Sequence, residues 1–272
     1  MSFPSMGPGG RLFCLATHHK TGTVWMRKVL HAYMGATETP LHGCYAPRRV
    51  DGLPQTGPVM VVNWSGTFPQ NLWDKPEARF IHLIRDPRDV LLSGMRYHQI
   101  AKFRKEKFLQ KTKPAWNGLN YQEYLLSLPS EREKLLFEMG EKHDQTIQEM
   151  LGWNWGHARA VELRYEDLMA DPSCTLFREA ITAMAVDGID IDLMVKLFWE
   201  QSLFGGLADE AARGEVPRGH ISEVGAGATA QWREKMPRDI AEEYAKRYGP
   251  ALKKLGYAED DSWVEEITQK AA

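Results

Sequence analysis

Short apolar runs alternate along the chain with longer stretches in which apolar residues recur at helical spacing. The first run, residues 11–17, is apolar as far as Ala16 and is followed by two histidines, which predicts a buried parallel strand. A helix is predicted from Thr21, because apolar side chains return at helical spacing until Gly35 supplies a stop signal. Residues 20–23 therefore lie at a strand-to-helix junction.

The rest of the chain repeats this alternation of strands and helices. Three more strands are predicted, at Pro58–Val62, Ala78–Ile84 and Val161–Tyr165. Helices are predicted at Pro87–His98, Glu131–Leu151, Ser173–Ala185 and Ile191–Gln201, with more from Asp239. The segments 38–57 and 205–227 are rich in glycine or proline and are expected to be loops. This pattern predicts an α/β fold with a central parallel sheet flanked by helices on both faces. We expect a single domain of residues 11–272 after a flexible N-terminus of residues 1–10.

Composition narrows the classes of function. The 272 residues are 43% hydrophobic and 26% charged, with a formal net charge of −2 and a pI near 6.5. This balance argues against a protein that binds nucleic acid without sequence preference, so any phosphate site must be local. No apolar run approaches the ~18 residues of a membrane span, and none has signal-peptide character. The cysteines show no paired spacing, which favours a reducing cytoplasm as the compartment. The sequence leaves open whether the protein is a homodimer.

The strand-to-helix junction carries the residues of an anion cradle. Lys20 supplies an ammonium, Thr21 and Thr23 supply hydroxyls, and Gly22 gives the backbone freedom to turn. Exposed N–H groups and the positive end of the helix dipole would point at the same spot, which favours a bound phosphate or sulfate. The P-loop pattern of nucleoside triphosphate enzymes is not met, because Lys20 precedes Gly22 instead of following it.

A second candidate segment follows the strand that ends at Ile84. Arg85 stands at the end of that strand, and Pro87 starts a helix that carries Ser93. In open α/β sheets, ligands bind beyond the carboxyl ends of the strands. Arg85 and the junction at residues 20–23 are therefore expected to share one crevice, with Ser93 two turns into the next helix.

Together the two segments resemble the phosphosulfate-binding loop and the 3′-phosphate-binding segment of the sulfotransferase family, in the family's order. The stretch Leu163–Pro172 is similar to a third family segment. The resemblance implies a P-loop nucleoside triphosphate hydrolase-like sulfotransferase fold. It implies 3′-phosphoadenosine-5′-phosphosulfate (PAPS) as donor and adenosine 3′,5′-bisphosphate (PAP) as product. The sulfuryl group would go to a hydroxyl or amine of a small-molecule acceptor, which the sequence does not identify.

The same resemblance assigns roles to residues of this chain. The residues that would hold the 5′-phosphosulfate are Lys20, Thr21, Gly22, Thr23 and Val24. Arg85 and Ser93 would bind the 3′-phosphate, and the residues around adenine would be Trp25, Tyr165 and Phe204. Lys20 would stabilise the bridging oxygen as its bond to sulfur breaks. Ser93 is expected to be a catalytic residue as well. The migrating group is less charged than a phosphoryl group, so no metal is expected.

The general base departs from the family pattern. Many members carry a His-Leu-Pro stretch whose histidine is the base, and the comparable stretch here is Thr67–Pro69. We expect His42 in this role, because it stands about twenty residues beyond Lys20, where other branches carry a glutamate, and an imidazole titrates near pH 7. The reserve candidates are His98, His18 and His19.

The glycine-rich loop before Trp232 is a second departure. The family's basic pair does not immediately precede the glycine and tryptophan of this segment. Arg218, or else Arg213, is expected to take its place at the 3′-phosphate.

Two other classes of function stay open. A P-loop kinase would need Asp86 or Asp89 to hold magnesium, but its motif order differs from the order found here. A protein that binds PAP or another nucleotide without catalysis would explain the missing His-Leu-Pro stretch.

Overall fold

The computed structural model describes residues 3–102, 106–208 and 227–268. The chain forms two compact units, each of which draws on two separate stretches of sequence. The sheet unit comprises Met1–Arg85 and Gly152–Glu215, and the helical unit comprises Asp86–Leu151 and Val216–Ala272. Each unit has buried apolar clusters of its own.

A five-stranded sheet forms the centre of the sheet unit. Its strands run in the order β2-β3-β1-β4-β5, and all neighbouring pairs are parallel. The strands are β1 (Leu12–Ala16), β2 (Leu41–Gly43), β3 (Val59–Asn63), β4 (Ala78–Ile84) and β5 (Ala160–Arg164). Every residue of β1, β3 and β4 is buried, as expected for central strands covered on both faces.

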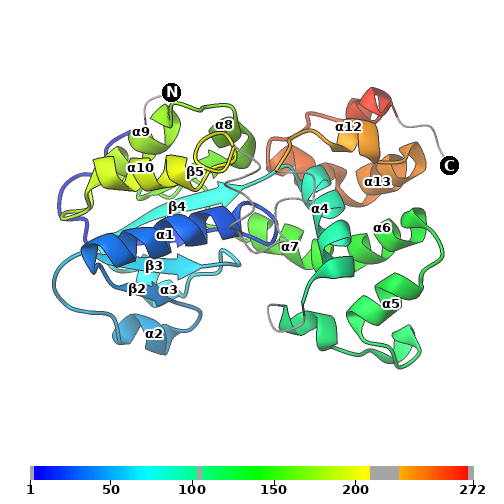
Figure 1. The fold of residues 1–272 in the computed structure, drawn as a ribbon, viewed down its shortest axis with the longest axis horizontal. Helices are drawn as coiled ribbons and strands as arrows, with labels where there is room; N and C mark the ends of the chain where they lie inside the picture. The colour runs from blue at the N-terminus through cyan, green and yellow to red at the C-terminus, as the bar shows by residue number, and fades with distance from the viewer. Residues whose placement is uncertain (1–2, 103–105, 209–226, 269–272) are drawn as a thin grey trace. The chain divides into compact units, whose positions relative to one another are not determined.

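Helices cover both faces of this sheet (Figure 1). Successive side chains of a strand alternate, so Phe13 and Ile81 belong to one apolar cluster and Cys14 and Phe80 to the other. The first face is covered by α1 (Thr23–Thr37), α8 (Tyr165–Met169), α9 (Thr175–Met184) and α10 (Ile191–Glu200). The second is covered by α2 (Pro47–Asp51), α3 (Gln70–Trp73) and Trp153. The predicted fold class is confirmed.

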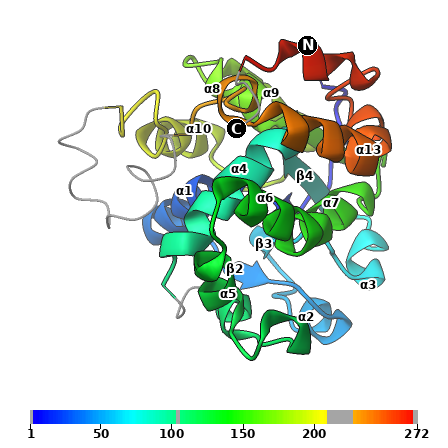
Figure 2. The same cartoon turned by 90° about the vertical axis from the view of Figure 1, so that its right-hand side faces the viewer.

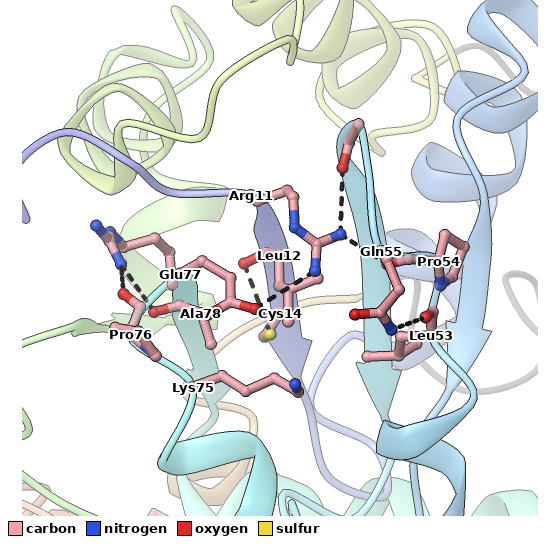
Figure 3. Close-up of polar contacts among 12 residues, drawn as sticks. Arg11, Leu12, Cys14, Leu53, Pro54, Gln55, Lys75, Pro76, Glu77 and Ala78 are labelled. Atoms are coloured by element: carbon pink, nitrogen blue, oxygen red, sulfur yellow. Dashed lines mark hydrogen bonds and ion pairs between the residues drawn. The ribbon is translucent and has the colours of Figure 1, made fainter.

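The amino ends of the strands are tied together by Arg11, which directly precedes β1 (Figure 3). Its guanidinium donates hydrogen bonds to the carbonyl oxygens of Pro54 at 2.8 Å and Gly57 at 3.3 Å, ahead of β3. It also forms a 3.4 Å ion pair with Glu77, which directly precedes β4. Structural hydrogen bonds thus occupy this edge of the sheet, and the candidate chemistry lies at the opposite, carboxyl edge.

The helical unit packs around α4 (Pro87–Ile100), which follows β4 in sequence. The other helices described in this unit are α5 (Tyr121–Ser127), α6 (Glu131–Gly140), α7 (Lys142–Leu151), α12 (Trp232–Lys235) and α13 (Arg238–Lys254). Short 3₁₀ turns lie at Lys107–Gln110, Pro114–Trp116 and Asp261–Glu266. Helix α6 lies beside α4, and α13 lies against α6 (Figure 2). Met95, Leu135 and Tyr244 share the core between them.

Two sequence predictions of local structure are wrong. Residues 38–57, expected to be a loop, contain β2 and α2. The run Leu41–Gly43 has little strand character of its own, and it becomes a strand because the edge of β3 supplies hydrogen-bond partners. The helix expected at Glu131–Leu151 is two helices, because the backbone of Glu141 leaves the helical region with a ψ of −103°.

The N-terminal stretch, expected to be flexible, contacts later parts of the sheet unit. The N–H of Met6 donates a 2.8 Å hydrogen bond to the carbonyl oxygen of Ala183. Gly10 forms an isolated parallel bridge with Val186. These contacts hold residues 6–10 against the last turn of α9 and the segment that follows it.

Candidate functional site

The loop between β1 and α1 is built around the backbone of His18. The His18 carbonyl oxygen accepts hydrogen bonds from the Thr21 N–H at 3.2 Å and from the Thr23 hydroxyl at 2.8 Å. The His18 N–H in turn donates to the Thr21 hydroxyl at 2.8 Å. The loop therefore turns back on itself within a few residues, and α1 begins directly after it.

Two residues of this loop have left-handed backbone conformations. Lys20 has a φ of 66° and Gly22 a φ of 107°. Gly22 caps α1, and a Cβ there would lie 3.1 Å from the Leu83 side chain and 3.2 Å from the Tyr165 ring. Glycine suits both this conformation and this space. Lys20 stands just ahead of the cap, so a cationic residue adjoins the positive end of the α1 dipole.

The threonines of the loop have partners within it. Thr21 is fully buried, and its hydroxyl lies 3.1 Å from the carbonyl oxygen of His18 and 3.2 Å from that of Leu83. The Thr23 hydroxyl lies 2.7 Å from that of Thr17. These side chains therefore shape the loop, and an anion bound there would meet its backbone N–H groups.

Arg85 approaches the same loop from the neighbouring strand. Its side chain is buried, with 4% exposed, and its Nη1 donates a 3.3 Å hydrogen bond to the carbonyl oxygen of Lys20. The guanidinium carbon lies 4.7 Å from the centre of the Tyr165 ring. The approach follows from topology, because β1 and β4 are adjacent and parallel, so the segments after them meet at one edge. The structure thus brings together Lys20, Gly22, Arg85 and Tyr165.

The three aromatic residues predicted around adenine lie together. Trp25 stands between the other two, with ring centres 6.3 Å from Tyr165 and 5.7 Å from Phe204, both edge to face. The Trp25 indole N–H donates a 3.1 Å hydrogen bond to the carbonyl oxygen of Phe198, which fixes the ring on α10. Val24, which precedes Trp25 in the first turn of α1, is half-buried. The aromatic group and the loop therefore share the N-terminal end of α1.

The remaining predicted donor residues are not part of the described sheet unit. Ser93 lies on α4 in the helical unit and is buried, with 6% exposed. Arg218 and its alternative Arg213 lie outside the described residues. The residues that the structure brings together are therefore those of the sheet unit.

The start of α4 carries a polar and aromatic cluster within the helical unit. The Asp86 carboxylate accepts hydrogen bonds from the Arg88 guanidinium at 2.9 and 2.7 Å. That guanidinium lies 3.8 Å from the centre of the Trp232 ring, and the Trp232 N–H donates a 3.1 Å hydrogen bond to Asp89. The segment at Trp232 is therefore anchored to the first turn of α4.

His42, the predicted base, lies on the edge strand β2. Its register partner is Val61 on β3, which pairs in turn with Cys14 on β1. The strand β3 therefore separates His42 from β1. His42 shares the register of Cys14, two residues before the end of β1. By backbone position, the structure does not bring His42 and Lys20 together.

His98, a reserve candidate for the base, belongs to a buried cluster of the helical unit. Its Nδ1 lies 2.7 Å from a carboxylate oxygen of Glu138, which also accepts a 2.7 Å hydrogen bond from the Tyr121 hydroxyl. Burial raises the pKa of Glu138, but the contacts with His98 and Tyr121 outweigh burial and hold that pKa below its ordinary value. Nothing in the sequence singles out Glu138, which is one of several glutamates in its helix.

His82 is another residue that sequence reasoning misses. It lies on β4, and its Nε2 is 2.7 Å from the Nε2 of His18, with both side chains fully buried. Burial, and next the neighbouring His18, hold the pKa of His82 well below its ordinary value. The one available signal is a histidine inside an otherwise apolar strand.

Other features of the described chain bear on the site. Within residues 3–102, 106–208 and 227–268, no group of three or more His, Cys, Asp or Glu side chains is arranged to hold a metal ion. In that same part of the chain, no helix has both the length and the apolar character needed to cross a membrane. Cys14, Cys44 and Cys174 are buried and free.

A family model described as a sulfotransferase domain matches residues 12–178, which is more than half of the chain. The matched region contains the loop after β1, Arg85, Ser93 and Tyr165. No protein with a curated description matches the sequence.

Solved structures share the fold at low sequence identity. Mouse sulfotransferase SULT7A1 complexed with PAP has a TM-score of 0.56 and 12% identity, over 96% of this chain and 88% of that one. Retinol dehydratase in complex with androsterone and inactive cofactor PAP has a TM-score of 0.52 and 15% identity, over 89% and 80%. Its complex with retinol and PAP has a TM-score of 0.51 and 15% identity, over 91% and 83%. The likeness confirms the predicted fold.

Proposed function

Because the chain belongs to the sulfotransferase family, we propose that it transfers a sulfuryl group from PAPS to a hydroxyl or amine of a small-molecule acceptor. The predicted enzyme class, sulfotransferase, follows from the family match. The observation that carries the donor assignment is the meeting of Arg85, Lys20 and Tyr165 at one edge of the sheet. A buried guanidinium beside a helix N-terminus and a lysine suits a ligand with several anionic groups.

The identity of the donor is supported by the structures that share the fold. Mouse SULT7A1 and retinol dehydratase were both solved with PAP. PAP carries a 5′-phosphate, a 3′-phosphate and an adenine, and the sheet unit offers a matching group of features. The loop at Lys20–Thr23 suits the 5′-phosphosulfate, Arg85 suits the 3′-phosphate, and the rings around Trp25 suit adenine.

The chemistry assigned to this chain is mainly electrostatic. Negative charge develops on the oxygen that bridges sulfur and the 5′-phosphate as the S–O bond breaks. The Lys20 ammonium and the N–H groups at the start of α1 would stabilise this charge, which lowers the barrier without any covalent intermediate. Ser93 and Arg218 complete the proposed set at the 3′-phosphate.

The general base is proposed from the histidines. His42 stays the first candidate, because it belongs to the sheet unit and is half-buried at the edge of the sheet. His98 is the second, because a carboxylate bound to Nδ1 is the arrangement that orients an imidazole for proton transfer. The acceptor is proposed to be small, and androsterone and retinol are found in the complexes of retinol dehydratase.

The kinase alternative loses support from the contacts at the start of α4. Asp86 is bound to the Arg88 guanidinium, and Asp89 accepts the N–H of Trp232. Both carboxylates that would hold magnesium therefore have structural partners. The non-catalytic alternative makes a different prediction from the proposed function, which is binding of PAP without transfer.

Two measurements test the proposal with the full chain. PAP should raise the melting temperature more than Mg·ATP at equal concentration, because a specific ligand stabilises the folded state by mass action. Labelled PAPS with a panel of phenol, steroid, sugar and amine acceptors should give a labelled product. Replacing Lys20 by Ala should lower kcat about 10²- to 10³-fold while PAP still binds. Stabilisation by Mg·ATP alone would contradict the donor assignment, and PAP binding with no labelled product would favour the non-catalytic alternative.

A further inference from the structure

The loop between β1 and α1, which carries Lys20–Thr23 and is called the donor loop below, contains one member of a buried histidine pair. His18 stands two residues beyond β1, and His82 lies on β4. Their Nε2 atoms are 2.7 Å apart, and the rings meet edge to face with centres 5.0 Å apart. One ring must therefore donate its Nε2–H to the other, which ties the end of β1 to the middle of β4 through side chains.

His82 is held firmly on its other side. Its ring stacks on Trp153, with centres 4.1 Å apart and an angle of 18° between the planes. The Trp153 indole N–H donates a 3.2 Å hydrogen bond to Glu162 on β5, and Glu162 is the register partner of His82. Strand pairing and ring stacking thus fix the position of His82 independently of its contact with His18.

His18 passes this constraint on to the donor loop. Its carbonyl oxygen accepts hydrogen bonds from the Thr21 N–H and the Thr23 hydroxyl, and its N–H donates to the Thr21 hydroxyl. These are bonds of the His18 backbone, so a shift of that backbone would break them together. It would displace the backbone on both sides of Gly22, where an anion would bind.

His18 also shapes the turn that follows β3. A Cβ on Gly66 would lie 2.4 Å from the His18 ring, and Gly66 has a φ of 67°. Glycine is therefore required there by the imidazole as well as by the backbone conformation. Thr67, which occupies the place of the usual family base, comes directly after it. One imidazole thus sets the positions of two loops at the carboxyl edge.

The two histidines form a polar pair among the buried side chains of the sheet unit. An apolar pair could fill the same volume, whereas two buried imidazoles lose hydration that their mutual hydrogen bond helps to offset. Unlike an apolar pair, the two histidines form a hydrogen bond, and this bond fixes the orientation of both rings. Burial holds the pKa of His82 well below its ordinary value, so this ring is neutral near pH 7.

We infer that His82 is a positioning residue for donor binding, which holds the loop at Lys20–Thr23 in its binding geometry through His18. The inference rests on the proposed function, since it assumes that PAP binds this loop. It assigns no contact between His82 and the donor.

Three variants of His82 test the inference by calorimetry with PAP. In His82→Leu the hydrogen bond is lost, and the Kd for PAP should rise about tenfold or more, as expected for a loss of roughly 1.4 kcal/mol or more of binding energy. In His82→Gln the amide reaches about as far as Nε2, so the Kd should stay within about threefold of wild type. In His82→Asn the amide is too short to reach His18, and the Kd should follow that of His82→Leu. With PAPS as substrate, the donor KM should rise in His82→Leu and be restored in His82→Gln.

A matched control separates positioning from loss of stability. His143 is also fully buried and makes one hydrogen bond, 2.8 Å from its Nε2 to the Tyr244 hydroxyl, in the helical unit. His143→Leu should lower the melting temperature as His82→Leu does, without changing the Kd for PAP. An unchanged Kd in His82→Leu, or an equal rise in His143→Leu, would overturn the inference. If His82→Leu does not fold, equal affinities of His82→Gln and His82→Asn would overturn it instead. Wild-type protein that fails to bind PAP would refute the proposed function itself, whatever the variants do.

Discussion

The guanidinium of Arg85 donates a 3.3 Å hydrogen bond to the backbone carbonyl oxygen of Lys20, although the two residues are 65 positions apart in sequence. The bond joins the two segments that carry the proposed donor site. It exists because β1 and β4 are neighbours in a parallel sheet, so the segments that follow them meet at one edge.

Arg85 should therefore bind the 3′-phosphate of the donor. Arg85→Ala should raise the Kd for PAP about 10- to 100-fold, because it removes charge-assisted hydrogen bonds to phosphate. The affinity for adenosine 5′-monophosphate, which lacks the 3′-phosphate, should change less than about threefold. Calorimetry with both nucleotides measures the difference. Arg27→Ala, on the exposed part of α1, is the control for lost positive charge and should leave both affinities unchanged.

Gly22 should tolerate no side chain. Gly22→Ala should destabilise the protein by about 1–3 kcal/mol, because the residue has a φ of 107° and its Cβ would press on Tyr165 and Leu83. It should also weaken PAP binding, since the cap of α1 would shift. Urea unfolding and calorimetry measure the two effects. Gly35→Ala, in the same helix with open space around it, should instead stabilise the protein by up to about 1 kcal/mol.

His42 and His98 make separable predictions as general bases. Replacing the true base by Gln should lower kcat about 10²- to 10⁴-fold and leave the Kd for PAP unchanged, because the base acts on the acceptor. Turnover of His42→Gln and His98→Gln with one accepted substrate decides between them. Full activity in His42→Gln would remove that residue from the mechanism. The melting temperature of His98→Gln must be measured alongside, since His98 is buried against Glu138.

Acid should destabilise the helical unit through His143. Burial lowers the pKa of His143 from 6.5 to about 4. The unfolded chain therefore takes up a proton below about pH 6.5 that the folded state does not take up until about pH 4. Stability contributed by the neutral ring is complete above pH 6.5 and falls as the pH drops, by about 2 kcal/mol between pH 7 and pH 5.

The test of this prediction is urea unfolding at pH 7 and pH 5. His143→Gln keeps a group that can bond to Tyr244 but does not titrate, so its loss of stability over this interval should be smaller than that of wild type by about 2 kcal/mol. Glu138 stays charged in the interval, because its pKa is held below the ordinary value. Equal losses in the two proteins would contradict the assignment.

The sequence predicts most elements of the sheet unit because their signals are local. The apolar run Ala78–Ile84 has the length of a strand, and it predicts β4 with the boundaries observed. The loop after β1 and the arginine after β4 are also visible in the sequence, since each stands where a strand ends. β2 is not visible, because a three-residue strand depends on the edge of β3 for its hydrogen bonds.

By itself, the sequence determines the family, the fold class and which loop is proposed to bind the donor, because these follow from patterns among residues close together in the chain. The sequence also predicts that Arg85 meets the loop at Lys20, and the family resemblance predicts that Trp25, Tyr165 and Phe204 lie together. The tertiary structure supplies the contacts of these residues, and it alone places His82 against His18. His18 and His82 are 64 residues apart, and neither imidazole predicts the other. Their contact depends on the pairing and register of β1 and β4, which the whole buried sheet decides.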